Sequence, residues 1–221
     1  MKEIRILSTK KLHPNQKQFL LNAGFSVVDA DFIKTKSVPF EIQDVKQNLI
    51  FTSSNAVKSI IENDFAGLKE KQCFCVGQKT KELLEQNGFS VKESAENASS
   101  LGKKINGNHK NESFTFFTGN LTLEILPEIL EEAKITHDLV EVYETTLTPV
   151  RIKARFDGIL FFSPSGIESY LNENTITNET CFCIGTTTAK ALQNITNNII
   201  IANQPSVENT IIQTINHYKK A

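Results

Sequence analysis

Two blocks of this sequence occur twice, in the same order along the chain. The stretch CFCVGQKT at residues 73–80 returns as CFCIGTTT at 181–188, and FTSSNAV at 51–57 returns as FFSPSGI at 161–167. The separation between the copies changes by only two residues from one block to the other. Related blocks in a fixed order indicate duplication of a structural unit. We therefore expect two lobes that share one fold.

Short runs of β-branched and aromatic residues alternate with helical patterns along the whole chain. The runs are bounded by Gly, Asn, Ser or Pro, as strands usually are. Such alternation is typical of the α/β class, in which helices cover parallel sheets. The expected strands are residues 4–8, 25–32, 49–53, 72–76, 89–92, 114–117, 139–143, 158–163, 181–184 and 198–202.

The repeat also predicts how the two lobes divide the chain. The first copy gives a continuous α/β lobe over residues 38–143, whereas the second copy is two strands short when the chain ends. The N-terminal segment supplies those strands, so we expect a discontinuous lobe of residues 1–35 plus 148–221. Linkers at 34–39 and 143–149 each end in a proline, which disfavours helix in the residue before it. This layout predicts a hinge with a cleft between the lobes.

The charge balance excludes several classes of partner. With 24 Lys+Arg and 25 Asp+Glu among 221 residues, the net charge is -1, whereas nucleic-acid-binding proteins usually carry a basic excess. The same balance disfavours attraction to anionic membranes, and no apolar run approaches the roughly 20 residues of a membrane span. The start of the chain lacks the apolar segment of a signal peptide. We expect a cytoplasmic protein without nucleic-acid or membrane partners.

Cysteines occur as two C-x-C pairs inside apolar runs, Cys73/Cys75 and Cys181/Cys183. Residues i and i+2 of a strand share a face, so each pair is predicted to be two small core residues. Their thiols would stay reduced in a cytoplasm. A four-cysteine zinc site is the alternative, and it would need all four thiolates to converge.

Small hydroxyl, amide or glycine residues follow several expected strands, where a helix should begin. In parallel sheets such turns lie at the carboxyl ends of the strands, where ligands bind, and helix N-termini favour anions. Plain N-capping is the alternative, because Ser, Thr and Asn are preferred caps with or without a ligand. The turns are TSSN at 52–55, GQKT at 77–80, SPSG at 163–166, GTTT at 185–188 and, as a fifth, TGN at 118–120.

Other chemical patterns are incomplete. GQKT at 77–80 lacks the earlier glycine of a P-loop, and FFSPSG at 161–166 is not the G-x-S-x-G of hydrolases. Segment 103–112 is predicted to be a mobile loop, with a basic rim contact to an anionic substrate as the alternative. The histidines lack metal-ligand spacing and are expected to be solvated or to cap helices; they are His13, His109, His137 and His217.

Tyr143 stands where the chain leaves the continuous lobe, in the sequence VYET. A tyrosine on a strand usually belongs to the core, with its hydroxyl at the edge. The position at the hinge favours a second role, because a phenol beside a cleft can donate a proton to a leaving group.

These motifs together resemble the uroporphyrinogen-III synthase family over the whole chain. The resemblance rests on TSSNAV at 52–57, VG with Thr80, VYET at 142–145, SPSGI at 163–167 and IGTTTA at 184–189. It implies two flavodoxin-like lobes joined by a two-stranded linker, and no metal or organic cofactor. It also implies a small-molecule substrate with eight carboxylates, hydroxymethylbilane, which the family closes to uroporphyrinogen III with inversion of ring D and loss of water.

The resemblance also implies roles for individual residues. Tyr143 would assist the departure of the hydroxyl group. Two departures from the family pattern are Phe162, where the first repeat has Thr52, and LTL at 121–123, where many relatives have an arginine. A monomer is expected, and a non-catalytic bilobal binder of a small polyanion is the alternative function. The implied carboxylate contacts are Ser53, Ser54, Asn55, Gly77, Thr80, Ser163, Ser165, Gly185, Thr187 and Thr188.

Overall fold

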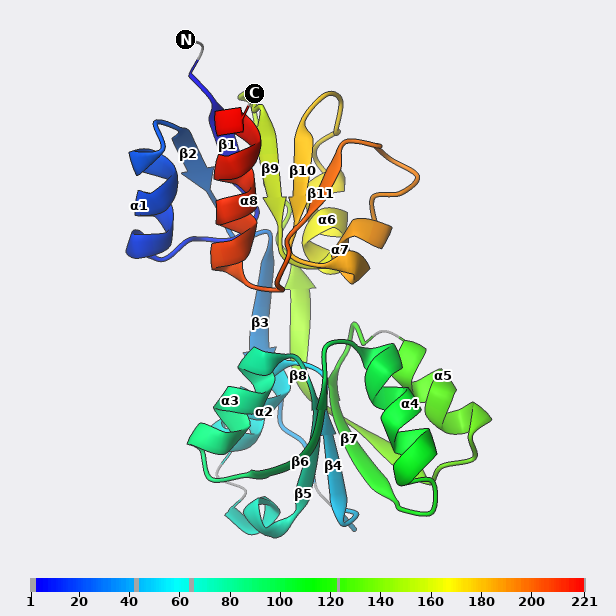
Figure 1. The fold of residues 1–221 in the computed structure, drawn as a ribbon. Coiled ribbons are helices and arrows are strands. Elements are labelled where there is room, and N and C mark those ends of the chain that lie inside the picture. Colours follow the sequence, from blue (N-terminus) through cyan, green and yellow to red (C-terminus); the bar gives the residue numbers. More distant parts are fainter. Residues whose placement is uncertain (1–2, 42–43, 64–65, 123, 221) are drawn as a thin grey trace. The chain divides into compact units, whose positions relative to one another are not determined.

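The computed structural model describes residues 3–41, 44–63, 66–122 and 124–220. The chain forms two compact units: unit 1 takes Met1–Lys34 and Thr146–Ala221, and unit 2 takes Thr35–Thr145. Met1, Lys2 and Ala221, which belong to the predicted discontinuous lobe, lie outside the described residues. Each unit carries a sheet with helices on both faces (Figure 1).

Unit 2 is built on a sheet with the strand order β3-β8-β7-β4-β5-β6. From β8 to β6 neighbouring strands are parallel, as the alternation of strands and helices predicts. The elements are β4 (Asn48–Phe51), α2 (Ser54–Glu62), the 3-10 helix η1 (Ala66–Glu70), β5 (Gln72–Val76), α3 (Gln78–Gln86), β6 (Ser90–Ala95), α4 (Ala98–Asn108), β7 (Phe114–Gly119) and α5 (Ile125–Glu132), with β3 (Ile33–Ser37) and β8 (His137–Leu147) at one side.

The strand β5 shows how the sequence makes both faces of this sheet apolar. Cys73 and Cys75 pack in the cluster that contains Val57 of α2 and Leu84 of α3. Phe74, between them, points the other way and packs with Leu101 of α4. A strand covered on both sides must be apolar at every position. This arrangement confirms that the cysteines of one pair share a face.

Unit 1 carries a parallel sheet with the strand order β11-β10-β9-β1-β2. The helices α1 and α8 cover one face, around Leu20 and Ile211. The helices α6 and α7 cover the other face, around Ile167 and Ala189. The elements are β1 (Arg5–Ser8), α1 (Pro14–Asn22), β2 (Ser26–Asp29), β9 (Gly158–Phe161), α6 (Pro164–Leu171), β10 (Thr180–Cys183), α7 (Thr186–Lys190), β11 (Ile199–Ile201) and α8 (Val207–Lys220).

The two units repeat one another in strand register as well as in sequence. Leu49 of β4 pairs with Cys73, and Ile159 of β9 pairs with Cys181 at the equivalent place. The order of buried, half-buried and exposed residues is identical over 51–60 and 161–170, and again over 73–80 and 181–188. The duplication inferred from the sequence is therefore present in the packing.

The chain passes between the units along β3 and β8, which are neighbours in the sheet (Figure 1). Val38 N–H donates to the Val142 carbonyl at 3.1 Å, and Lys36 lies 3.0 Å from Glu144. As one residue number rises the other falls, so the two strands are antiparallel. The residues at 34–39 alone predicted a linker there, while the family resemblance implied two strands. Ile33 and Thr35, β-branched residues two apart, were the local signal for β3.

Among the described residues, no helix is both long and apolar enough to cross a membrane.

Candidate functional site

In unit 2 the predicted turns come together at the carboxyl edge of the sheet, because β4 and β5 are parallel neighbours. Ser53 is the N-cap of α2, and its Oγ accepts a hydrogen bond from Asn55 N–H at 3.1 Å. Ser54 and Asn55 form the first turn of α2 and are half-buried. The capping interpretation is thus confirmed for Ser53. Its hydroxyl proton remains available to a ligand, because a serine accepts through its lone pairs while it donates its O–H.

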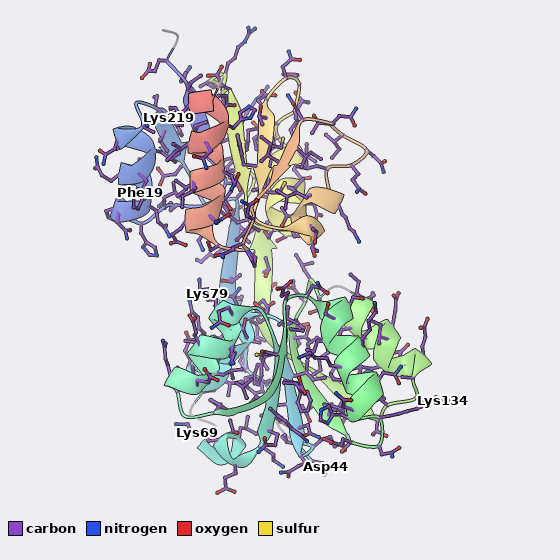
Figure 2. All side chains as sticks on the ribbon, in the orientation of Figure 1. Phe19, Asp44, Lys69, Lys79, Lys134 and Lys219 are labelled. Atoms are coloured by element: carbon purple, nitrogen blue, oxygen red, sulfur yellow. The ribbon has the colours of Figure 1, made fainter. Side chains whose placement is uncertain are left out.

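Gly77 occupies the next turn, between β5 and α3. Its φ of +85° is a conformation that side chains of other residues disfavour, and its N–H donates to the Ala95 carbonyl at 2.8 Å. Thr80 is buried beneath this turn, whereas Lys79, labelled in Figure 2, is exposed on the first turn of α3. The turn therefore presents the N-terminus of a helix beside a cation, which is an arrangement suited to anions.

In unit 1 the equivalent turns lie at the carboxyl ends of β9 and β10. Ser163 caps α6: its Oγ accepts from Gly166 N–H at 3.0 Å and lies 3.1 Å from the Oγ of Ser165. Both serines are half-buried, so their hydroxyls remain within reach of a ligand.

The second turn of unit 1 differs from its counterpart in unit 2. Gly185 has an extended backbone with φ -171°, and the helix that follows, α7, has five residues against nine in α3. Thr187 is exposed and Thr188 is buried. A helix this short leaves fewer aligned peptide dipoles to attract an anion.

Tyr143 lies at the same edge of unit 2 as the Ser53 and Gly77 turns. It is half-buried on β8, in register with Gly119, the last residue of β7. Its ring borders the core cluster of Val142 and Phe117. A Cβ placed on Gly119 would come within 2.5 Å of the Tyr143 ring, so any larger residue at this position would have to displace the ring.

The fifth predicted turn, 118–120, does not begin a helix. The strand β7 runs to Gly119, and α5 begins at Ile125. Asn120 instead uses its side-chain amide on β8: Oδ1 accepts from Thr145 N–H at 2.8 Å and Nδ2 donates to the Thr145 carbonyl at 3.2 Å. The residues 121–123 include Leu123, which lies outside the described residues.

The predicted loop at 103–112 is wrong for most of its length, because α4 continues to Asn108. Ala98, Leu101 and Ile105 pack against the sheet, and this apolar spacing outweighs Gly107 near the helix end. His109 is the C-cap residue of α4, but its side chain is buried at 9% exposure and is not solvated.

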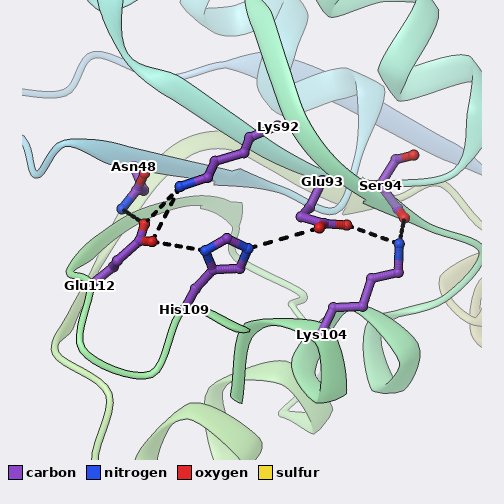
Figure 3. Close-up of polar contacts among 7 residues, drawn as sticks. All are labelled: Asn48, Lys92, Glu93, Ser94, Lys104, His109 and Glu112. Atoms are coloured by element: carbon purple, nitrogen blue, oxygen red, sulfur yellow. Dashed lines mark hydrogen bonds and ion pairs between the residues drawn. The ribbon is translucent and has the colours of Figure 1, made fainter. Parts of the chain in front are cut away.

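A network of charges surrounds His109 (Figure 3). Nδ1 lies 2.8 Å from Glu112 Oε1, and Nε2 lies 3.8 Å from Glu93. The hydrogen bond with His109 is the main cause that lowers the pKa of Glu112. Lys104, 2.9 Å from Glu93, is the main cause that lowers the pKa of that carboxyl group. Glu112 precedes β7, so this network lies away from the carboxyl edge where the turns meet.

All four cysteines are free and buried. Burial raises the pKa of Cys75 to about 11 and the pKa of Cys73, Cys181 and Cys183 to about 12. Protonated thiols in an apolar cluster are poor metal ligands. Among the described residues, no group of three or more His, Cys, Asp or Glu could hold a metal ion.

A hollow of about 540 Å³ opens in unit 1 at the amino ends of β9 and β10. Its lining includes Arg151, Arg155 and Glu179. None of the residues predicted for the site lines it, and it lies at the opposite edge of the sheet from the Ser163 and Gly185 turns.

Sequence reasoning missed three residues at the carboxyl edge of unit 2. They are Lys79, Gly119 and Asn120. The incomplete P-loop pattern gives Lys79 no role of its own, and TGN at 118–120 resembles a helix start although the next helix begins only at Ile125. The signal for Asn120 is its distance from the next helix, since five residues separate Gly119 from Ile125 and leave the amide free to bind elsewhere.

The sequence model of one protein family, described as uroporphyrinogen-III synthase HemD, matches residues 16–212. Among solved structures, the uroporphyrinogen-III synthetase of Helicobacter pylori is similar with a TM-score of 0.71 and 22% identity, over 98% of this chain and 100% of that chain. A mutant uroporphyrinogen III synthase of the extremely thermophilic bacterium Thermus thermophilus gives a TM-score of 0.70 and 14% identity, over 99% and 100%. No curated protein sequence matches significantly.

Proposed function

The chain belongs to the uroporphyrinogen-III synthase family, and we propose that it performs the family's reaction with the turn residues and the tyrosine described above. It is a cyclising lyase of tetrapyrrole (haem) biosynthesis that acts on a small molecule. A non-catalytic polyanion binder is not favoured, because the matching family is one of enzymes.

For this reaction the protein must mainly control the relative positions of the reacting carbons, and strong acids, bases or nucleophiles matter less. Loss of the hydroxymethyl hydroxyl as water leaves an azafulvene cation on hydroxymethylbilane. Attack from the substituted carbon of ring D gives a spiro intermediate, which fragments and closes again with that ring reversed. Because the bilane also closes unaided to the uninverted isomer I, the chain must mainly hold the reacting carbons in place.

We assign the eight carboxylates of the substrate to the turns at the carboxyl edges. Ser53 and Ser163 accept from backbone N–H groups through their oxygen atoms, which leaves each of them an O–H that can donate to a carboxylate. We add Lys79, whose exposed ammonium group stands beside the Gly77 turn. The remaining proposed contacts are Ser54, Asn55, Gly77, Thr80, Ser165, Gly185, Thr187 and Thr188, of which the buried Thr80 and Thr188 would support the turns from beneath.

Tyr143 is the residue that we propose for the proton transfer. Its phenol would donate the proton that leaves with the hydroxyl group as water. The observation that carries this proposal is the place of the Tyr143 ring over Gly119, at the edge where the Ser53 and Gly77 turns also lie.

Product analysis tests the function. Hydroxymethylbilane is generated in place, the products are oxidised, and isomers I and III are separated. We expect isomer III to predominate over a protein-free control. Isomer I alone, from protein that circular dichroism shows to be folded, would overturn the proposal, and a titration with uroporphyrinogen would then tell a binder from a protein without affinity.

We also propose that the protein works in the cytoplasm as a monomer. Four free, buried thiols suit a reducing compartment. The exposed large apolar residues include Phe19 of α1, Leu139 of β8 and Ile212 of α8, which belong to different elements. Light scattering after gel filtration measures the mass in solution, and a dimer would contradict the proposal.

A further inference from the structure

Beyond Gly119, the strand β8 runs past the end of its neighbour β7. The residues of β8 after Tyr143 therefore lose ladder hydrogen bonds on that side. The amide of Asn120 replaces them, because it accepts from Thr145 N–H at 2.8 Å and donates to the Thr145 carbonyl at 3.2 Å. Its own backbone N–H donates to the Tyr143 carbonyl at 3.3 Å. One residue thus holds β8 at Tyr143 and again two residues later.

The residue before Tyr143 is fixed from other directions. The Val142 carbonyl accepts from Val38 N–H at 3.1 Å and from the hydroxyl of Ser59, and Val142 is fully buried. The ring of Tyr143 rests on Gly119. The Tyr143 hydroxyl itself has no hydrogen-bond partner among the residues that the structure describes. The backbone is therefore held on every side while the hydroxyl stays unengaged.

We propose that Asn120 is a positioning residue for the ring closure, and that it acts by holding β8 so that the Tyr143 hydroxyl keeps one place at the carboxyl edge. This inference rests on the proposed function of Tyr143. The turn at 118–120 would then have a structural role that does not require an arginine, because the Asn120 amide binds the backbone of β8 and not the substrate. A proton donor that is misplaced by about 1 Å loses much of its effect. A side chain that fixes the position of β8 therefore affects the rate of the reaction.

The test is a double-mutant cycle with Asn120→Ala and Tyr143→Phe. Asn120→Ala is expected to lower kcat for isomer III about 10-fold and to leave KM within about 2-fold, since the carboxylate turns are untouched. In the Tyr143→Phe background the same change should lower kcat no further. Asn174→Ala is the matched control, because this asparagine of unit 1 binds the backbone of Ile152 and Val150 in the same manner. It should lower the melting temperature and leave kcat unchanged.

Two results would overturn the inference. One is a wild-type kcat for Asn120→Ala, and the other is an equal loss with and without the Tyr143 hydroxyl. Wild-type turnover by Tyr143→Phe would mark a different failure, that of the proposed function of Tyr143, on which the inference depends. If Asn120→Ala does not fold, Asn120→Ser carries the same expectations, because a serine keeps a polar side chain in the turn but lacks the amide that makes both bonds to Thr145.

Discussion

Both units make one equivalent backbone hydrogen bond near the point where the chain passes between them. In unit 2 the Val142 carbonyl accepts from Val38 N–H at 3.1 Å, and in unit 1 the Phe32 carbonyl accepts from Thr148 N–H at 2.9 Å. Val142 and Phe32 are both fully buried. Duplication has therefore preserved the exit of the chain from each lobe.

The residue that follows differs between the units, and only one of the two residues carries a hydroxyl group. Tyr143 follows in unit 2 and Ile33 follows in unit 1. The polar turns occur in both units, whereas a hydroxyl at the exit occurs in one. Under the proposed function, binding groups and the proton donor are therefore separable: the polar turns, which occur in both units, would contact carboxylates, and the residue proposed for the proton transfer occurs in unit 2 alone.

The largest expected effect comes from removing that hydroxyl. Tyr143→Phe should slow isomer III formation by about 100-fold or more, the range for loss of a general acid, while the ring stays on Gly119 and the fold survives. Initial rates corrected for unaided closure measure the effect. Tyr170→Phe is the control, because Tyr170 is buried in the core of unit 1. If the two variants show equal rates, the difference between the lobes has no chemical meaning.

A smaller effect is expected from the two repeat glycines. Gly77→Ala should lower the free energy of unfolding by about 1–3 kcal/mol, the cost of a strained backbone, since φ is +85° there. Gly185→Ala should change it by a few tenths, about 0.5 kcal/mol at most, because φ is -171° and no atom lies within 4 Å of the new Cβ. Urea unfolding followed by circular dichroism compares them. Equal losses would contradict the difference between the turns.

The equivalent serines of α2 and α6 give a third comparison. The Ser59 hydroxyl donates to the Val142 carbonyl, while the Ser169 hydroxyl is buried without a partner among the described residues. Ser59→Ala should destabilise the protein by about 1 kcal/mol, the net value of a hydrogen bond. Ser169→Ala should be neutral or stabilising, since an unpaired buried hydroxyl is removed. Thermal unfolding of the two variants measures the difference. A larger loss of stability from Ser169→Ala than from Ser59→Ala would show that the Ser169 hydroxyl is not unpaired.

The smallest effect concerns acid and the network around His109. The folded protein lowers the pKa of Glu93 and Glu112, so their contribution to stability is present above the ordinary glutamate value of about 4.3. It is lost as the pH falls through the lowered values. Glu112→Gln should therefore flatten the decline in melting temperature below about pH 4.3. The exposed Glu131→Gln serves as control, and parallel curves for both variants would contradict the expectation.

The repeat made the class of fold and the burial of the core predictable. The C-x-C spacing predicted that Cys73 and Cys75 share a face, because a strand has a period of two, and they do. The segment at 103–112 was not predictable from its Gly, Asn and Lys residues, since packing of Leu101 and Ile105 against the sheet decides for helix. In this segment the packing of apolar side chains against the sheet therefore outweighs the low helix propensity of the local sequence.

The candidate site was predictable only in part. Helix starts at Ser53 and Ser163 followed from capping preferences, because the residue type and its local role coincide. The surroundings of Tyr143 were not predictable in this way. Gly119 lies against the Tyr143 ring and Asn120 bonds to Thr145, and in each case the partner is more than twenty residues further along the chain. Contacts between strands that are distant in sequence leave no local pattern.

One measurement separates binding from chemistry most directly: Tyr143→Phe is assayed for isomer III formation and, in the same preparation, titrated with uroporphyrinogen III. We expect a Kd within about 2-fold of the wild type, because the proposed carboxylate contacts in the turns are unchanged, together with turnover slowed by about 100-fold or more. Wild-type turnover by this variant would contradict the role of Tyr143 as proton donor.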